Sequence, residues 1–179
     1  MVANTRFLTM KDKTYPYDQA LAIAQDILEQ LRPYCERIQI AGSLRRECPQ
    51  VGDIELVVIP KPYETGLFEN GLAAVVNQWP KVKGEMEYGV TKYTQRILPT
   101  GIKLDLFFAE PGNWGSILAI RTGSTEFSHR VLAVGWTKLG YESRGGYLWR
   151  DGRMREVREE RDLFNIINIP YTEPKNRNL

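Results

Sequence analysis

The sequence predicts an α+β fold in which a mixed sheet with helices fills the first part of the chain and a small, mostly helical lobe follows. Three features indicate this fold: a helical pattern near the start, several strand-like segments before residue 109, and a change to helical patterns after Pro111. The 179 residues are enough for one well-buried core with a small second lobe. We therefore expect a first part over residues 1–112 and a second over residues 113–179.

The first part is expected to contain two helices and four strands. An amphipathic helix is predicted over 15–34, where apolar residues recur at helical spacing at Leu21, Ala24, Ile27, Leu28 and Leu31. Strands are predicted in "RIQIAGS", which runs into a glycine turn, and in "DIELVVIP", which ends at Pro60. A helix follows in "LFENGLAAVVNQW". An antiparallel hairpin is then expected from "YGVTKYTQRIL" and "IKLDLFF", joined by a turn at residues 99–101.

The second part has the pattern of a helical lobe with one hairpin. Helices are predicted in "WGSILAIRTGS" and "TEFSHRVLAVGWTKLG", and a last short helix in "ERDLFNIINI". Between them, the glycines of "ESRGGYLWRDGRM" indicate a hairpin. Pro111, in "EPGN", lies at the change between the two patterns.

Composition excludes several classes of protein. Two cysteines and one histidine are too few for a disulfide framework or for the usual zinc sites. The polar leader does not resemble a signal peptide, and no apolar run reaches the length of a membrane span, so we expect a soluble, cytoplasmic protein without membrane partners. A formal net charge of +2 means that any nucleic-acid-binding surface must be local.

Three carboxylates are the first candidates for chemistry. Asp53 and Glu55 alternate with apolar residues in one strand, so both side chains point to the same face, and Asp105 has an apolar residue on each side in another strand. If the two strands are neighbours, the three side chains converge. Like charges at close range raise one another's pKa, and a pair of Mg²⁺ ions would relieve this repulsion. Two such ions about 4 Å apart can activate a hydroxyl and stabilise a leaving pyrophosphate, and Mn²⁺ can substitute.

A possible phosphate site precedes these acids in "GSLRRE". The backbone N–H groups of a glycine turn at a helix start, the Ser43 hydroxyl and an arginine can together bind a polyphosphate. Taken alone, a Gly-Ser pair is more often a helix N-cap, and adjacent arginines are more often part of a solvated face. Here the turn is followed first by a strand with Asp-x-Glu and later by a strand with an isolated Asp. This combination favours a phosphate-binding site over a helix cap or a solvated surface.

These motifs resemble family X DNA polymerases, the beta-type repair polymerases. The stretch "GSLRRECPQVGDIELVV" is similar to the family's Gly-Ser-x-Arg-Arg and Gly-Asp-x-Asp signature, and "KLDLFF" to the strand with its third metal carboxylate. Further on, "RTGSTEFSHRVL" resembles the Thr-Gly-Ser-x-x-Phe-Asn helix, and "EERDLFNIINIPYTEPKNR" resembles the C-terminal Tyr-x-Glu-Pro-x-x-Arg end. The resemblance extends in order from about residue 15 to residue 177.

The resemblance implies a role for each matched residue. The metal ligands would be Asp53, Glu55 and Asp105, with Asp105 also polarising or deprotonating the primer 3′-hydroxyl. The triphosphate would contact Gly42, Ser43, Arg46 and Gly52. Nucleotide binding would also involve Gly123 and Ser124, beside the sugar and base, and Ser128 and His129, on the helix that borders the nascent base pair. Residues 1–112 would be a nucleotidyltransferase palm, and residues 113–179 the lobe that closes over the nucleotide.

The chain departs from the family pattern at several positions. Glu55 replaces the usual Asp, and Ile120-Arg121 replaces the aromatic pair that precedes Thr-Gly-Ser. Ser128 replaces Asn, and Leu132 replaces a frequent Arg. The resemblance includes no amino-terminal DNA-binding lobe with its lyase lysine, so we expect a minimal two-lobe form without 5′-deoxyribose-phosphate removal.

The expected function is that of a monomeric DNA-directed DNA polymerase that extends a primer 3′-OH with dNTPs in gap-filling repair. Primer-template or gapped DNA would contact an arginine-bearing hairpin at Arg150, Arg153 and Arg155, although acids between these residues also allow a merely solvated surface. His129 has a similar alternative, as a residue at the surface or at the edge of the core. One rival function is nucleotidyl transfer to an antibiotic, a protein or an RNA end, which Glu55 favours slightly. Another is a non-catalytic nucleic-acid-binding module, which the intact acid triad argues against.

Overall fold

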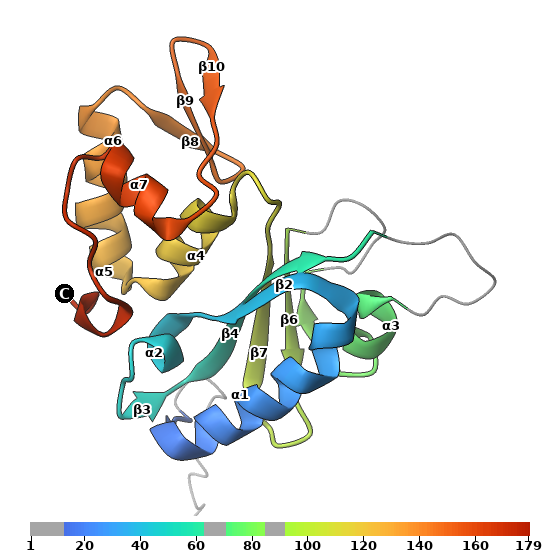
Figure 1. Cartoon of the computed structure of the whole chain (residues 1–179). Coiled ribbons are helices and arrows are strands. Elements are labelled where there is room, and N and C mark those ends of the chain that lie inside the picture. Colours follow the sequence, from blue (N-terminus) through green and yellow to red (C-terminus); the bar gives the residue numbers. More distant parts are fainter. Residues whose placement is uncertain (1–12, 63–70, 85–91) are drawn as a thin grey trace, which may run out of the picture.

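The computed structural model describes residues 13–62, 71–84 and 92–179. Its main sheet has the strand order β2-β4-β7-β6-β5 (Figure 1). The strands are β2 (Cys35–Ile40), β4 (Asp53–Pro60), β5 (Lys81–Lys83), β6 (Tyr93–Ile97) and β7 (Lys103–Phe108). Only β4 and β7 pair in parallel, and the other neighbours are antiparallel. The predicted α+β class, the mixed sheet and the β6–β7 hairpin are therefore confirmed.

One face of this sheet is buried under helices of the first part. Helix α1 (Tyr17–Leu31) is followed by the 3₁₀ turn η2 (Arg32–Tyr34), and both lie within the predicted helix. The buried side of α1 packs in one hydrophobic cluster with the short helix α3 (Leu72–Val76) and with alternate residues of β4 and β7. A small ladder of β1 (Tyr15–Pro16) and β3 (Gln50–Val51) lies beside it. Because side chains alternate along a strand, the remaining residues of β4 and β7 point to the opposite face.

The C-terminal part has its own hydrophobic core. Its helices are α4 (Trp114–Thr122), α5 (Thr125–Phe127), the π-helical segment η3 (Ser128–Ala133), α6 (Val134–Lys138), α7 (Glu160–Ile166) and the 3₁₀ turn η4 (Pro174–Asn176). Its strands are β8 (Glu142–Arg144), β9 (Tyr147–Arg150) and β10 (Arg153–Arg155). The core includes Phe127, Leu132, Trp136, Leu148 and Phe164.

The predicted glycine-rich hairpin is a three-stranded sheet with the order β10-β9-β8. Both of its turns have two consecutive residues at positive φ, Gly145-Gly146 and Asp151-Gly152. This is the backbone of the tight turns that match the twist of paired strands, so each turn returns the chain directly onto its neighbour.

The two parts meet on the second face of the main sheet. Trp114 and Leu118 of α4 pack against Val57, Ile59 and Phe107 of the sheet. The same strand face holds Asp53, Glu55 and Asp105 nearer the start of β4 and β7, so α4 covers the face only beyond these acids.

Parts of three predicted segments lie outside the described residues: 1–12 of the leader, 67–70 of the second predicted helix and 88–91 of the strand before residue 99. Within the described ranges, no helix combines the length and the apolar character needed to cross a membrane.

Candidate active site

Asp53, Glu55 and Asp105 lie on one face of the neighbouring parallel strands β4 and β7, which we call the carboxylate face. The register pairs Glu55 directly with Asp105, and Asp53 lies two residues before Glu55. On the other face, the residues that flank these acids in β4 and β7 are fully buried: Ile54, Leu56, Leu104 and Leu106. The alternation of apolar and acidic residues therefore holds the three carboxylates on a rigid surface.

The electrostatics of the carboxylate face are unfavourable for charged acids. Burial raises the pKa of Glu55 from its ordinary value of 4.5 to about 8, and repulsion from Asp53 and Asp105 adds to the shift. Burial, followed by repulsion from Asp105, also raises the pKa of Asp53. None of the three acids forms an ion pair with a lysine or arginine of the described chain. Among the described residues, no lysine or arginine thus neutralises their negative charges by direct contact.

Asp105 is held in place by two residues that sequence reasoning missed. The Tyr93 hydroxyl donates to Asp105 Oδ1 at 2.8 Å, and Gln95 Nε2 donates to the same oxygen at 2.6 Å. Both bonds end on Oδ1, so neither engages Oδ2. A signal for Gln95 was present in the sequence, since a hairpin centred on Thr100 places Gln95 opposite Asp105, as observed.

The carboxylate face offers only oxygen ligands, the set that Mg²⁺ and Mn²⁺ prefer. Among the described residues, no three His, Cys, Asp or Glu side chains are already gathered closely enough to hold a metal ion. Glu55 instead packs against the turn at Gly42. The three acids share a face, and burial followed by repulsion from neighbouring acids raises the pKa of Asp53 and of Glu55. The donor chemistry therefore fits a hard cation, with Asp53, Glu55 and Asp105 as the residues that could hold it.

Gly42 begins the short helix α2 (Gly42–Arg45) and contacts the carboxylate face directly. Its φ of +62° favours glycine, and a Cβ atom at this position would collide with the Glu55 carboxylate. The Ala41 N–H also donates to the Glu55 carbonyl at 2.8 Å. The predicted phosphate-binding turn is therefore adjacent to the acids. Ser43 on this turn is half-buried, and the space beside Gly52 is open.

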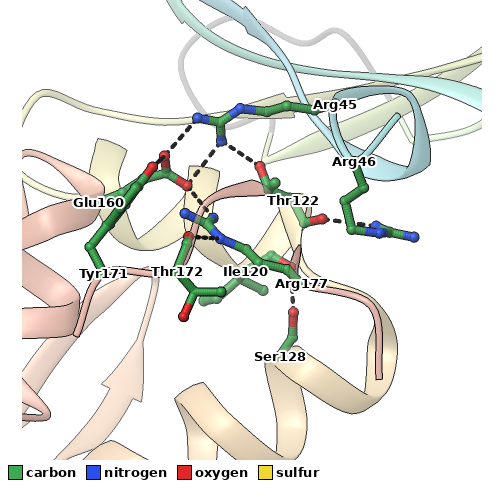
Figure 2. A network of polar contacts seen from close by, with 9 residues as sticks. All are labelled: Arg45, Arg46, Ile120, Thr122, Ser128, Glu160, Tyr171, Thr172 and Arg177. Atoms are coloured by element: carbon green, nitrogen blue, oxygen red, sulfur yellow. Dashed lines mark hydrogen bonds and ion pairs between the residues drawn. The ribbon is translucent and has the colours of Figure 1, made fainter. Parts of the chain in front are cut away.

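The two adjacent arginines have different surroundings (Figure 2). Arg45 forms two hydrogen bonds with the Glu160 carboxylate, at 2.9 and 2.7 Å, and donates to Thr122 Oγ1 at 2.6 Å. Arg46, predicted to bind triphosphate, donates to the Thr122 carbonyl at 2.8 Å and to Asn178 Oδ1 at 2.6 Å. Both arginines thus connect α2 to the C-terminal part.

Glu160 is the centre of a buried polar network, which we call the interlobe network and which comprises Arg45, Thr122, Glu160 and Arg177. The fully buried Arg177 donates to Glu160 Oε1 at 2.5 Å and to the Thr172 carbonyl at 2.8 Å. Burial opposes the charged form of Glu160, but hydrogen bonds and charge from Arg45 and Arg177 outweigh it, and the pKa of Glu160 is lowered. Sequence reasoning did not predict this network.

The Thr-Gly-Ser motif lies at the end of α4 and the start of α5. Ser124 caps α5 by accepting from the Phe127 N–H at 3.1 Å, and its hydroxyl also accepts from the Leu179 N–H at 3.3 Å. Ser128 donates to the Ile120 carbonyl at 2.7 Å, close to Gly123, where a Cβ atom would crowd the Ser128 hydroxyl. These residues therefore make local contacts that shape the segment.

Two further predicted positions lie on the surface of the C-terminal part. His129 is exposed and lines a shallow, mainly apolar pocket with Ala133, Val134, Thr137 and Lys138. The three predicted DNA-binding residues, Arg150, Arg153 and Arg155, are exposed on β9 and β10. Arg150 lies 4.9 Å from the centre of the Tyr141 ring and Arg155 donates to its hydroxyl at 3.2 Å. Figure 1 shows this sheet at the end of the molecule away from α2.

Comparison with known protein families gives one match. Residues 117–178 match the family described as DNA polymerase beta thumb. No curated protein is similar enough to the chain to count as a match. The C-terminal part is therefore similar to the thumb of beta-type polymerases, and the carboxylate face lies outside the matched residues.

Proposed function

We propose that the protein is a family X type nucleotidyltransferase that extends a primer 3′-OH with dNTPs. The observation that supports this most strongly is the carboxylate face: three acids without an ion pair among the described residues, two of them with raised pKa values, beside a glycine turn. Acids whose pKa values are shifted by burial and by a specific charged neighbour cluster at functional sites. The thumb match in residues 117–178 supports a polymerase as the specific activity.

In this proposal, Asp53, Glu55 and Asp105 hold two Mg²⁺ ions, for which Mn²⁺ can substitute. The bound cations would neutralise the acids and favour ionisation of the attacking hydroxyl. The backbone N–H groups of α2 and the Ser43 hydroxyl bind the triphosphate, beside Gly42 and Gly52. Arg46 joins them once it leaves its contacts with Thr122 and Asn178.

The reaction forms a bond between the primer 3′-oxygen and the α-phosphorus and breaks the bond to pyrophosphate. Asp105 orients the hydroxyl through Oδ2 and takes its proton, while Tyr93 and Gln95 fix the carboxylate through Oδ1. The sugar and base of the incoming dNTP lie along the segment that contains Gly123, Ser124, Ser128 and His129.

We further propose that residues 1–112 form the palm and residues 113–179 the lobe that closes over the nucleotide. The interlobe network connects α2 of the first part directly to α7 of the second. Gapped or primer-template DNA is held through its phosphates, with Arg150, Arg153 and Arg155 among the contacts, in a monomer that serves gap-filling repair.

A second candidate function is nucleotidyl transfer to a small molecule, a protein or an RNA end. The longer side chain of Glu55, which packs on Gly42, is the observation that favours it. The two functions share the carboxylate face and differ only in the acceptor.

Primer extension tests the proposal. The purified protein, with Mg²⁺ and dNTPs, is given single-stranded, gapped and blunt untemplated DNA, and Asp53→Ala is the matched inactive control. We expect extension of the gapped substrate by the wild type and none by the variant. Transfer to a non-DNA acceptor without DNA extension would favour the second function, and equal extension by Asp53→Ala would refute the assigned site.

A further inference from the structure

Among the arginines that the structure describes near the carboxylate face, Arg121 has the fewest polar contacts. It lies in the last turn of α4, is exposed, and stacks on the Phe107 ring with its central carbon 4.0 Å from the ring centre. Within the described chain it has no hydrogen-bond or ion-pair partner. An arginine stacked on a ring keeps its N–H donors at the edge of the plane, where they can bind a planar or tetrahedral anion.

The sheet register fixes where this guanidinium lies. Phe107 is two residues beyond Asp105 on β7, so both side chains are on the carboxylate face. Tyr93 lies opposite Phe107, stacks on it at 5.0 Å between ring centres, and donates to Asp105. Arg121, which lies over Phe107, therefore covers the row of residues next to the acids.

The other two arginines near this site are occupied. Arg45 is committed to Glu160 and Thr122, with only 16% of its side chain exposed. Arg46 donates to the Thr122 carbonyl and to Asn178. Of these three cations, Arg121 alone can accept an anionic ligand without breaking a hydrogen bond.

We infer that Arg121 binds a phosphate of the incoming nucleoside triphosphate and is a nucleotide-affinity residue of this site. The inference rests on the proposed function, because it takes a nucleoside triphosphate as the ligand of the carboxylate face. The sheet supplies the aromatic ring of Phe107, and α4 supplies the cation that lies over it.

The test separates nucleotide affinity from turnover. Arg121→Ala and Arg121→Lys are compared with Arg32→Ala, an exposed arginine beside α1 whose ion-pair partner is the exposed Glu29. Steady-state incorporation gives KM for dNTP and kcat, and equilibrium binding of a fluorescent dATP analogue with Mg²⁺ gives an affinity independent of turnover. Circular dichroism melting checks that each variant is folded.

We expect Arg121→Ala to raise KM and the dissociation constant by about 10- to 100-fold, the effect of losing hydrogen bonds to a charged group, with kcat changed much less. Arg121→Lys should recover part of the affinity, since it keeps the charge but loses the planar fork. Arg32→Ala should match the wild type.

The outcomes distinguish this inference from the proposed function. Active wild type with unchanged KM and affinity in Arg121→Ala would overturn the inference alone. Nucleotide binding that depends on Arg121, in a protein that extends no primer, would support the inference and refute the polymerase. A wild type that binds no nucleotide would overturn both.

Discussion

Glu55 and Glu160 are both acids with little solvent exposure, yet their surroundings shift their pKa values in opposite directions. Glu160 receives hydrogen bonds from Arg45 and Arg177, and its pKa is lowered despite burial. Glu55 has two other acids for neighbours and no ion pair in the described chain, and burial with their repulsion raises its pKa to about 8.

We interpret the difference as that between an acid that stabilises the fold, Glu160, and an acid that we propose binds a ligand, Glu55. A buried carboxylate with two guanidinium partners is neutralised within the protein, so the interlobe network needs nothing further. The carboxylate face has no such guanidinium partners within the described ranges, and a bound cation would neutralise it instead. Substitutions in the carboxylate face should therefore mainly affect activity, and substitutions in the interlobe network should mainly affect stability.

The largest effect is expected at Asp105. Asp105→Asn should reduce nucleotide incorporation by several orders of magnitude, because it removes the residue that we propose as a metal ligand and as the acceptor of the hydroxyl proton. Its melting temperature without Mg²⁺ should equal or exceed that of the wild type, since like-charge repulsion is relieved. Single-turnover incorporation and calorimetry measure the two quantities. Near-normal incorporation would remove Asp105 from the site.

The next effect is on stability, at Glu160. Glu160→Gln leaves two buried guanidinium groups without their carboxylate and should cost about 3–5 kcal/mol in the free energy of unfolding. The matched control is Glu159→Gln, because Glu159 pairs with Arg37 at the surface, where the side chains are 57% and 41% exposed. That loss should be about 1 kcal/mol or less. Urea unfolding measures both, and equal losses would contradict a structural role specific to the interlobe network.

The pH dependence of stability should have opposite signs for the two acids. The raised pKa of Glu55 favours its protonated form in the folded state. Its contribution to the free energy of unfolding is therefore fully present below pH 4.5 and is lost as the pH rises towards about 8. The lowered pKa of Glu160 favours its charged form in the folded state. Glu160 therefore adds to the free energy of unfolding when the pH is above its ordinary pKa of 4.5, and this stabilisation is lost as the pH falls below that value.

Unfolding without Mg²⁺ between pH 5 and pH 9 tests the expectation for Glu55. The free energy of unfolding of the wild type should decline by on the order of a few kcal/mol as the pH rises, and Glu55→Gln should make this decline smaller. A wild type whose stability does not change over this range would show that the carboxylate face is not strained by its charges.

The sequence predicts those parts of the site that depend on local patterns, and it misses those that depend on contacts between residues far apart in the chain. Alternation in "DIELVVIP" is local, and it correctly places Asp53 and Glu55 on the same face of their strand. Asp105 shares that face because β7 pairs with β4, which the local pattern does not determine. The position of the turn at Thr100 also determines the register of the hairpin, which pairs Gln95 with Asp105. By contrast, Arg45 and Glu160 are separated by 115 residues, and nothing local distinguishes Arg45, which pairs with Glu160, from its neighbour Arg46, which bonds to Thr122 and Asn178.

The smallest effect is expected far from both acids, at the three arginines of β9 and β10. Replacing Arg150, Arg153 and Arg155 with Ala should flatten the log-log salt dependence of DNA binding by up to about three units. Nucleotide affinity should be unchanged, since these residues do not contact the carboxylate face. Anisotropy titrations of gapped DNA at several salt concentrations measure the slope. An unchanged slope would leave these arginines as a solvated surface.

The most direct test of the difference between the two acids is the shift in melting temperature caused by Mg²⁺ at pH 8. Wild type and Glu160→Gln should both gain stability from Mg²⁺, because both keep the carboxylate face, while Asp105→Asn should gain little or none. The same ordering should hold with Mn²⁺. If Mg²⁺ does not stabilise the wild type, or stabilises Asp105→Asn equally, the carboxylate face is not a cation site and the account is wrong.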